Sequence, residues 1–329
     1  MSFRVMNIGK AEIFSDAIAE NYRKNSDNPA YSQTGTAFSI NSTSDIHTVI
    51  KLPNAITTDI WFKLDLFVDS TSNYSTGFQA GMWSRTDTYA NRNFYWLNGI
   101  YMYDGQIRLN LNGNYSNSNN TARVDLKKQA LNKIWCHLHN ETGTNASYGE
   151  LLVNGTEKQF FYTRSSSAYA IDSKPEAAYR FAFLFPNSPT CYISNIIISD
   201  EYINPKEQII KLPISSTESD MTFDSETGIY TATATNQSLL SAVNVNALAE
   251  EYGSDSTVTG VALVGNPAYK TAEGLSSLTA FSKDSSGNAT NYGTYALGSD
   301  SSGVIADSQI LTGKTISDLQ NLKFGWIAK

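Results

Sequence analysis

Charged residues are scarce in this chain. They make up 17% of its 329 residues, against about 25% in a typical soluble protein. The net charge is −7, and no basic patch is present that would release counterions from nucleic acid or from an anionic membrane. The composition therefore predicts neither a nucleic-acid partner nor binding to a charged membrane surface.

Long apolar runs are missing as well. No stretch approaches the ~18 apolar residues that suggest a membrane-spanning helix. The first residues, Met1 to Lys10, lack the apolar core and cleavage site of a secretory signal. We therefore expect a protein that is made in a cytoplasm and that reaches the outside, if it does, by another route. Assembly into a virus particle that lyses its host is one such route, and a virion is the location we expect.

Cysteine is almost absent. The two cysteines, Cys136 and Cys191, lie inside apolar, strand-like runs, and this placement favours two small, buried hydrophobic side chains. A disulfide between them is the alternative, although a chain of this length does not need one.

Strand signals dominate what is present. Residues 59–69 alternate between Ile60, Phe62, Leu64, Leu66 and Val68 on one face and mostly polar residues on the other. Further strands are predicted at 77–84, 94–97, 107–111, 179–185 and 192–199. Short strands separated by turn signals indicate a two-sheet sandwich and not βαβ units. A short helix is predicted over 11–24, on an imperfect helical period.

The stretch 132–161 carries the clearest topological signal. Two apolar runs, 133–139 and 150–153, flank a polar loop, and the second run ends in Asn154-Gly155, the strongest two-residue hairpin signal. We expect the two runs to be antiparallel neighbours, with 158–163 folding back after the turn.

This stretch resembles the middle of concanavalin A-like jelly rolls, in particular the laminin-G-like branch. The matching features are Trp135-x-His137, the loop, and Leu151-x-Val153-Asn154-Gly155. The run at 193–200 is similar to the final strand of laminin-G-like domains, so the resemblance spans roughly residues 12 to 203. It implies a mainly β fold, a two-sheet jelly-roll sandwich over residues 1–212.

A second domain is predicted over residues 213–329. The segment 203–213 is the boundary, because it ends at Pro213 and a polar, turn-rich stretch follows it. Beyond it the sequence favours a small β-rich (α+β) domain, with strands at 229–241, 257–264, 275–282 and 324–328, a helix at 245–252, a loop at 283–293 and a helical turn at 315–321. The runs 252–260, 265–269 and 319–326 resemble small terminal modules of phage tail and fibre proteins.

Catalytic and metal-binding patterns are weak. His137 and His139 are two apart on one strand and point the same way, as two metal ligands do, but the sequence names no third ligand, and two side chains lining one sheet face is the simpler interpretation. Glycosidases on concanavalin-like folds need two carboxylates about 5–9 Å apart. Asp65 and Asp69 share a face, yet four residues along a strand span about 13 Å. We therefore expect no enzyme activity, no catalytic residues and no cofactor. Calcium, which some laminin-G-like domains bind, stays open, without ligands assigned.

The candidate ligand site is a region rich in aromatic residues and asparagine. Aromatic faces stack on the apolar side of sugar rings, while Asn and Arg side chains bind hydroxyl groups. Ordinary packing on a sheet and a subunit interface are the alternatives. The predicted glycan-binding residues are Trp83, Arg85, Tyr89, Arg92, Tyr95, Trp96, Tyr101 and Tyr103.

Three functions follow as hypotheses. The first is a non-enzymatic structural or appendage protein of a phage or prophage virion, self-associating as a homotrimer, contacting other virion proteins and binding host cell-surface polysaccharide. The second is a free carbohydrate-binding lectin of a bacterium. The third is a glycoside hydrolase or lyase.

Overall fold

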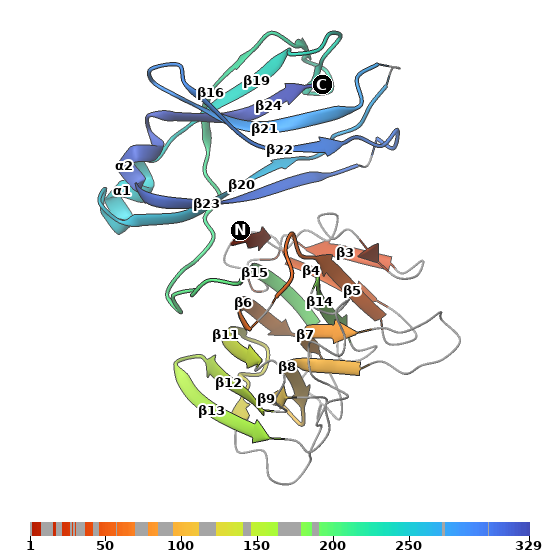
Figure 1. Ribbon diagram of the computed structural model, residues 1–329, viewed down its shortest axis with the longest axis vertical. Helices are drawn as coiled ribbons and strands as arrows, with labels where there is room; N and C mark the ends of the chain where they lie inside the picture. Colours follow the sequence, from red (N-terminus) through yellow and green to blue (C-terminus); the bar gives the residue numbers. More distant parts are fainter. Residues whose placement is uncertain are drawn as a thin grey trace. The chain divides into compact units, whose positions relative to one another are not determined.

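The chain divides into two compact units, Met1–Ile209 and Ile210–Lys329, and the sequence placed the boundary between residues 212 and 213. Most strands of both units are labelled in Figure 1. The computed structural model describes residues 2–7, 16–17, 22–26, 28, 30, 37–41, 46–56, 58–69, 78–84, 95–111, 123–140, 146–163, 179–185, 191–271, 274–301 and 303–329.

One sheet of the first unit has eight strands. Its order is β13-β12-β11-β6-β15-β4-β3, with β1 also pairing with β15. These strands are β1 (Arg4–Asn7), β3 (Tyr22–Ser26), β4 (Ala37–Asn41), β6 (Asp59–Val68), β11 (Leu131–Asn140), β12 (Ala146–Val153), β13 (Thr156–Thr163) and β15 (Cys191–Ser199). The strand expected to close the domain, β15, therefore lies inside the sheet, between β6 and β4.

The other sheet has seven strands, in the order β10-β9-β8-β7-β14-β5-β2. They are β2 (Asp16–Ala17), β5 (Ile46–Lys51), β7 (Gln79–Ser84), β8 (Tyr95–Tyr103), β9 (Gln106–Leu111), β10 (Arg123–Asp125) and β14 (Arg180–Phe185). Both sheets are antiparallel throughout their described pairs.

The core of the first unit joins the two sheets. Alternate residues of each strand face inward, and Phe62 of the eight-stranded sheet meets Phe181 of the seven-stranded sheet with ring centroids 4.9 Å apart. Cys136 and Cys191 are buried thiols that form no disulfide with each other, and they belong to this core, as expected of small hydrophobic residues. The mainly β, two-sheet jelly-roll sandwich predicted from the sequence is confirmed.

The hairpin predicted around Asn154 is also confirmed. Strands β11 and β12 are antiparallel neighbours, with Ile134 opposite Val153, and β12 pairs with β13 after the turn. Asn154 and Gly155 have φ of 52° and 87°, the two left-handed conformations that a type I′ turn requires.

The helix predicted over residues 11–24 is wrong where the structure describes it. Asp16–Ala17 and Tyr22–Ser26 are strands, and the rest of that range lies outside the described residues. Strand β3 pairs with β4 along its whole length, so sheet pairing overrides the imperfect helical period of the sequence.

The second unit combines a five-stranded sheet with two separate pairs of strands. The five-stranded order is β16-β19-β24-β21-β22, and β17-β18 and β20-β23 form separate pairs. The elements are β16 (Ile214–Ser219), β17 (Thr222–Asp224), β18 (Ile229–Thr231), β19 (Ser238–Val243), α1 (Asn246–Tyr252), β20 (Thr257–Gly265), β21 (Ser277–Asp284), β22 (Ala289–Ala296), β23 (Ile305–Thr315), α2 (Ile316–Leu319) and β24 (Leu322–Ala328). Neither helix is long and apolar enough to cross a membrane, among the residues that the structure describes.

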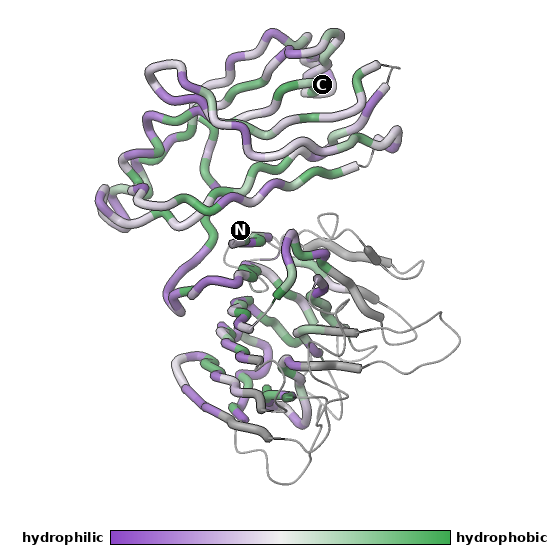
Figure 2. Tube along the Cα trace, viewed as in Figure 1, coloured by the Kyte–Doolittle hydropathy of each residue, from purple (hydrophilic) through white to green (hydrophobic). Residues whose placement is uncertain are grey.

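Two expectations for this unit need correction. The single strand expected over 229–241 is two strands, β18 and β19, separated by a turn, and half of the loop expected over 283–293 is strand β22. Small and polar residues hide these strands from a hydrophobicity pattern, as the mixed colours of this unit in Figure 2 illustrate. The small β-rich α+β character of the unit is confirmed.

Candidate functional site

The predicted aromatic residues lie on strands β7 and β8 or in the segment between them. Arg85, Tyr89 and Arg92 lie outside the described residues. For Trp83, Tyr95 and Trp96 the structure describes the backbone, and Trp83 stands opposite Trp96 across the β7–β8 pair. Tyr101 and Tyr103 are described fully, and both side chains point away from the core.

Four neighbouring strands place polar residues in rows beside these tyrosines. Gln79 of β7 stands opposite Tyr101 of β8, which stands opposite Arg108 of β9, and Arg108 stands opposite Arg123 of β10. The next row, toward the turn that joins β8 to β9, contains Tyr103, Gln106 and Asp125. We call this surface the β7–β10 face: Gln79, Tyr101, Tyr103, Gln106, Arg108, Asn110, Arg123 and Asp125.

Two glycines make a floor in the adjacent row. Gly81 and Gly99 are direct cross-strand partners, with Asn110 next to them on β9. A Cβ at Gly99 would collide with the carbonyl oxygen of Ala80 and would lie 3.0 Å from the Cα of Gly81. The sequence therefore leaves a backbone surface without side chains between the polar residues of the β7–β10 face.

A chain of hydrogen bonds holds the accessible end of this face. Arg108 donates to Gln106 Oε1 at 3.1 Å, and Gln106 donates from Nε2 to Asp125 Oδ1 at 2.7 Å. The Arg108 guanidinium carbon lies 4.9 Å from the ring centroid of Tyr103, a cation–π distance. The Tyr103 side chain is 42% exposed, and Arg123 and Asp125 are exposed as well.

Several polar atoms on the β7–β10 face are buried without a partner. Among the described residues, Gln79 Oε1, Arg108 Nε and Asn110 Oδ1 make no hydrogen bond. Arg108 is 7% exposed and Asn110 is 2% exposed. Buried polar groups nearly always have partners, and an unsatisfied group costs about 1–3 kcal/mol. These atoms therefore keep a hydrogen-bonding capacity that the described residues do not use.

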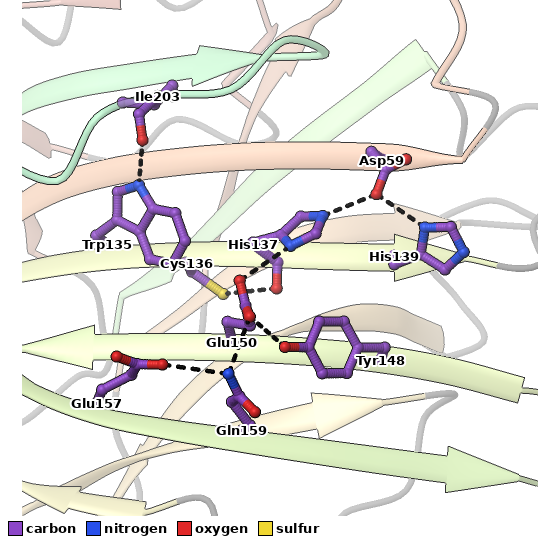
Figure 3. A network of polar contacts seen from close by, with 10 residues as sticks. All are labelled: Asp59, Trp135, Cys136, His137, His139, Tyr148, Glu150, Glu157, Gln159 and Ile203. Atoms are coloured by element: carbon purple, nitrogen blue, oxygen red, sulfur yellow. Dashed lines mark hydrogen bonds and ion pairs between the residues drawn. The ribbon is translucent and has the colours of Figure 1, made fainter.

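The two histidines lie on the outer face of the other sheet, in a polar network shown in Figure 3. His137 of β11 contacts Asp59 Oδ1 through Nε2 at 2.7 Å and Glu150 Oε2 through Nδ1 at 3.3 Å. His139 Nδ1 lies 2.8 Å from the same Asp59 oxygen. The ring of Trp61 stacks on His137 at 4.4 Å, with the two planes 4° apart.

Glu150 is the second centre of this network. It accepts hydrogen bonds from the hydroxyl of Tyr148 and from Gln159 Nε2 at 3.1 Å. Burial, together with the Glu150 carboxylate, raises the pKa of Tyr148 well above its usual range, so its hydroxyl remains a donor. His137, His139, Asp59, Tyr148 and Glu150 are thus all partners within one network.

Asp59 stays a carboxylate in these surroundings. Burial alone would raise its pKa, but the hydrogen bonds and charges of His137 and His139 outweigh burial and lower it. Within the described part of the chain, no three His, Cys, Asp or Glu side chains form a group that could hold a metal ion. The histidine pair predicted from the sequence therefore belongs to a side-chain network across β6, β11 and β12.

A segment after β15 covers the rest of this outer face. Trp135 donates from Nε1 to the carbonyl of Ile203 at 2.6 Å, and Lys63 donates to the carbonyl of Pro205 at 3.0 Å. Asp65 is completely buried, and burial raises its pKa. Lys63, Asp65 and Trp135 are therefore buried, although the alternation along residues 59–69 places Lys63 and Asp65 on the face opposite the core. Asp65, the first carboxylate considered for a glycosidase pair, is not at the surface.

Sequence reasoning missed Gln79 and Asp59, and it did not select Arg108 or Asn110. The alternation of apolar and polar residues over 107–111 already places Arg108 and Asn110 on the face opposite the core. The missing information was the strand register, which brings Gln79 into line with Tyr101 and Arg108, and Asp59 into line with His139.

The comparisons with known proteins give structural likenesses only. No protein-family model matches the chain, and no curated protein matches it. Basic winged bean lectin is 9% identical, with 60% of this chain and 97% of that chain covered and a TM-score of 0.37. A GH131 β-glucanase catalytic domain from Podospora anserina is 13% identical, with 56% and 81% covered and a TM-score of 0.34.

A carbohydrate esterase from the Shiga toxin-encoding bacteriophage phi24B is 9% identical, with 56% of this chain and 88% of that chain covered and a TM-score of 0.35. Because identities and TM-scores are this low, the assignment of a two-sheet sandwich rests on the sheet order and register described above.

Proposed function

We propose that this chain binds carbohydrate through the β7–β10 face and does not cleave it. The observation that carries the proposal is the row Gln79–Tyr101–Arg108 beside the Gly81–Gly99 floor, with buried polar atoms that have no partner in the described residues. Sugars offer hydroxyl groups as donors and acceptors, and a ring face that packs on an aromatic side chain.

Tyr103 is the aromatic contact in this proposal. Its ring is exposed, and the guanidinium of Arg108 lies against it, so its orientation is restrained before a ligand arrives. Restraint of this kind reduces the entropy lost on binding. Of the eight residues predicted from the sequence, Trp83, Tyr95, Trp96, Tyr101 and Tyr103 lie on β7 and β8, and Arg85, Tyr89 and Arg92, which lie outside the described residues, stay predictions.

The test is binding of the purified chain to a panel of polysaccharides by affinity gel electrophoresis. Tyr103→Ala should weaken binding about fivefold, because an aromatic contact contributes about 1 kcal/mol. Tyr202→Ala is the matched control, since Tyr202 is 60% exposed and lies outside the β7–β10 face. Equal effects of the two substitutions, or no retardation by any polysaccharide, would contradict the proposal.

The absence of cleavage is also part of the proposal. Asp65 is fully buried while Asp69 is exposed, so this pair does not meet in one cleft. Release of reducing or unsaturated sugars from the polysaccharides that bind would favour the hydrolase or lyase alternative.

At a finer level, we propose a structural or appendage protein of a phage or prophage virion that contacts host polysaccharide. The low charge content and the separate β-rich second unit support this context. Light scattering after size exclusion distinguishes a virion appendage from a free lectin. For an appendage we expect a trimer of the 36.1 kDa chain that persists on dilution. A monomer that still binds glycans would favour the free lectin instead.

A further inference from the structure

We propose that the glycan bound by the β7–β10 face is acidic, and that an oxyanion on the sugar, a carboxylate or a sulfate ester, pairs with Arg108 and Arg123. This inference rests on the proposed function and names the chemical class of its ligand.

The first argument is the buried charge of Arg108. Arg108 is 7% exposed. Within the described residues its guanidinium contacts only the amide oxygen of Gln106 and the ring of Tyr103. A charge removed from water without a counter-charge is costly, and buried charges are normally paired. Arg108 therefore lacks the counter-ion that a buried guanidinium normally has.

The other buried cations of the described residues show the contrast. Arg4 is 5% exposed and pairs with Glu207 at 2.6 Å. Lys63 is 4% exposed and donates to two backbone carbonyls; burial lowers its pKa, and the nearby carboxylate of Asp65 opposes that shift. Only Arg108 among these three lies on the β7–β10 face, and its contacts within the described residues are the Gln106 amide and the Tyr103 ring, neither of which is an anion.

The second argument is the position of Arg123. It stands directly opposite Arg108 across the β9–β10 pair, so both side chains lie on the same face. Two like charges in direct cross-strand positions repel each other and destabilise the pair. An anion between them would relieve this repulsion. The nearest carboxylate on the same face, Asp125, is engaged by Gln106 at 2.7 Å and does not bridge the two arginines.

The third argument is the set of donors and acceptors that remain. Arg108 Nε has no partner, and a guanidinium with free N–H groups matches the geometry of a carboxylate or sulfate. Gln79 Oε1 and Asn110 Oδ1 are unpaired acceptors, which suit the hydroxyl groups of the same sugar. The whole chain carries a net charge of −7, so attraction of an acidic polymer has to be local to this face.

The experiment uses the full chain and two matched pairs of probes. Polygalacturonate is compared with its fully methyl-esterified form, and dextran sulfate with dextran, by affinity electrophoresis and calorimetry at two salt concentrations. At least one acidic probe should bind at least tenfold more tightly than its neutral partner, and this binding should weaken as salt rises. Retention of polygalacturonate identifies a carboxylate, and retention of dextran sulfate alone identifies a sulfate ester.

Two substitutions locate the anion. Arg108→Lys keeps the positive charge but removes the planar guanidinium that can donate two parallel hydrogen bonds to an oxyanion. It should weaken binding of the acidic probe about tenfold. Arg123→Gln lies on an exposed residue, so folding is not at risk, and should weaken it about fivefold. Lys158→Gln is the control: it removes the same charge from an exposed position on β13 of the other sheet and should change nothing.

The outcomes separate the two proposals. Equal binding of acidic and neutral partners, or equal effects of Arg123→Gln and Lys158→Gln, overturns the acidic ligand and leaves carbohydrate binding intact. If no polysaccharide binds, carbohydrate binding falls, and the acidic ligand falls with it. If Arg108→Lys does not fold, judged by near-ultraviolet circular dichroism, Arg123→Gln decides alone.

Discussion

Replacing Asp59 with asparagine tests the account of the histidine network. Asp59 Oδ1 is 2.7 Å from His137 Nε2 and 2.8 Å from His139 Nδ1. Asparagine keeps an acceptor oxygen and removes the charge, and charge-assisted hydrogen bonds are about twice as strong as neutral ones. With 27% of the Asp59 side chain exposed, solvent weakens the effect, so we expect a loss of about 1 kcal/mol of unfolding free energy.

The pH dependence of this loss follows from the direction of the Asp59 pKa shift. The pKa lies below the ordinary value of 3.8, so the carboxylate contributes its stability at pH values above 3.8. That contribution disappears as pH falls through the lower, folded-state value. The wild type and Asp59→Asn should therefore differ by about 1 kcal/mol near pH 6 and should converge on further acidification.

Urea unfolding monitored by tryptophan fluorescence measures this difference. Four of the five tryptophans, Trp61, Trp83, Trp96 and Trp135, belong to the first unit, so the signal reports mainly on its unfolding. Glu201→Gln, an equal charge change at an exposed position, is the control. A stability difference that is absent at pH 6, or that persists undiminished below the folded pKa, would refute the reasoning.

Three further predictions concern packing. Gly325→Ala should destabilise the second unit by about 1–3 kcal/mol, because the new Cβ would collide with a backbone carbonyl of β19; thermal unfolding measures this. Trp135→Phe should cost about 1–3 kcal/mol in urea unfolding, because it leaves the carbonyl of Ile203 without its donor, and an unchanged midpoint would contradict that bond. Cys136 and Cys191 are fully buried and burial raises both thiol pKa values, so a thiol reagent should react only after denaturation, and fast reaction of the native chain would be inconsistent with their place in the core.

Strands with one apolar face were predictable from the sequence. The alternation along β6 and the Asn154-Gly155 turn both depend on neighbours a few residues away, and both appear in the structure. Strand β3 was mistaken for part of a helix. Its conformation depends on pairing with β4, which follows more than ten residues later in the sequence and so does not appear in a local pattern. Strand β22 was missed, because its small and polar residues show no regular alternation of apolar and polar side chains.

The candidate site depends on register, which the sequence pattern does not contain. Tyr101 and Tyr103 were found because aromatic residues on a strand are visible in sequence. Gln79 and Arg108 were not, because their importance arises only when three strands align them in one row. Burial of an unpaired guanidinium is likewise a property of the folded chain.

Hydrogen exchange of the full chain, with and without polygalacturonate, tests the central claim most directly. Ligand binding at the β7–β10 face should slow amide exchange in β7, β8, β9 and β10, and should leave β11, β12 and β13 of the other sheet unchanged. Slowing confined to those latter strands, or to the second unit, would contradict the claim that this chain binds carbohydrate through the β7–β10 face.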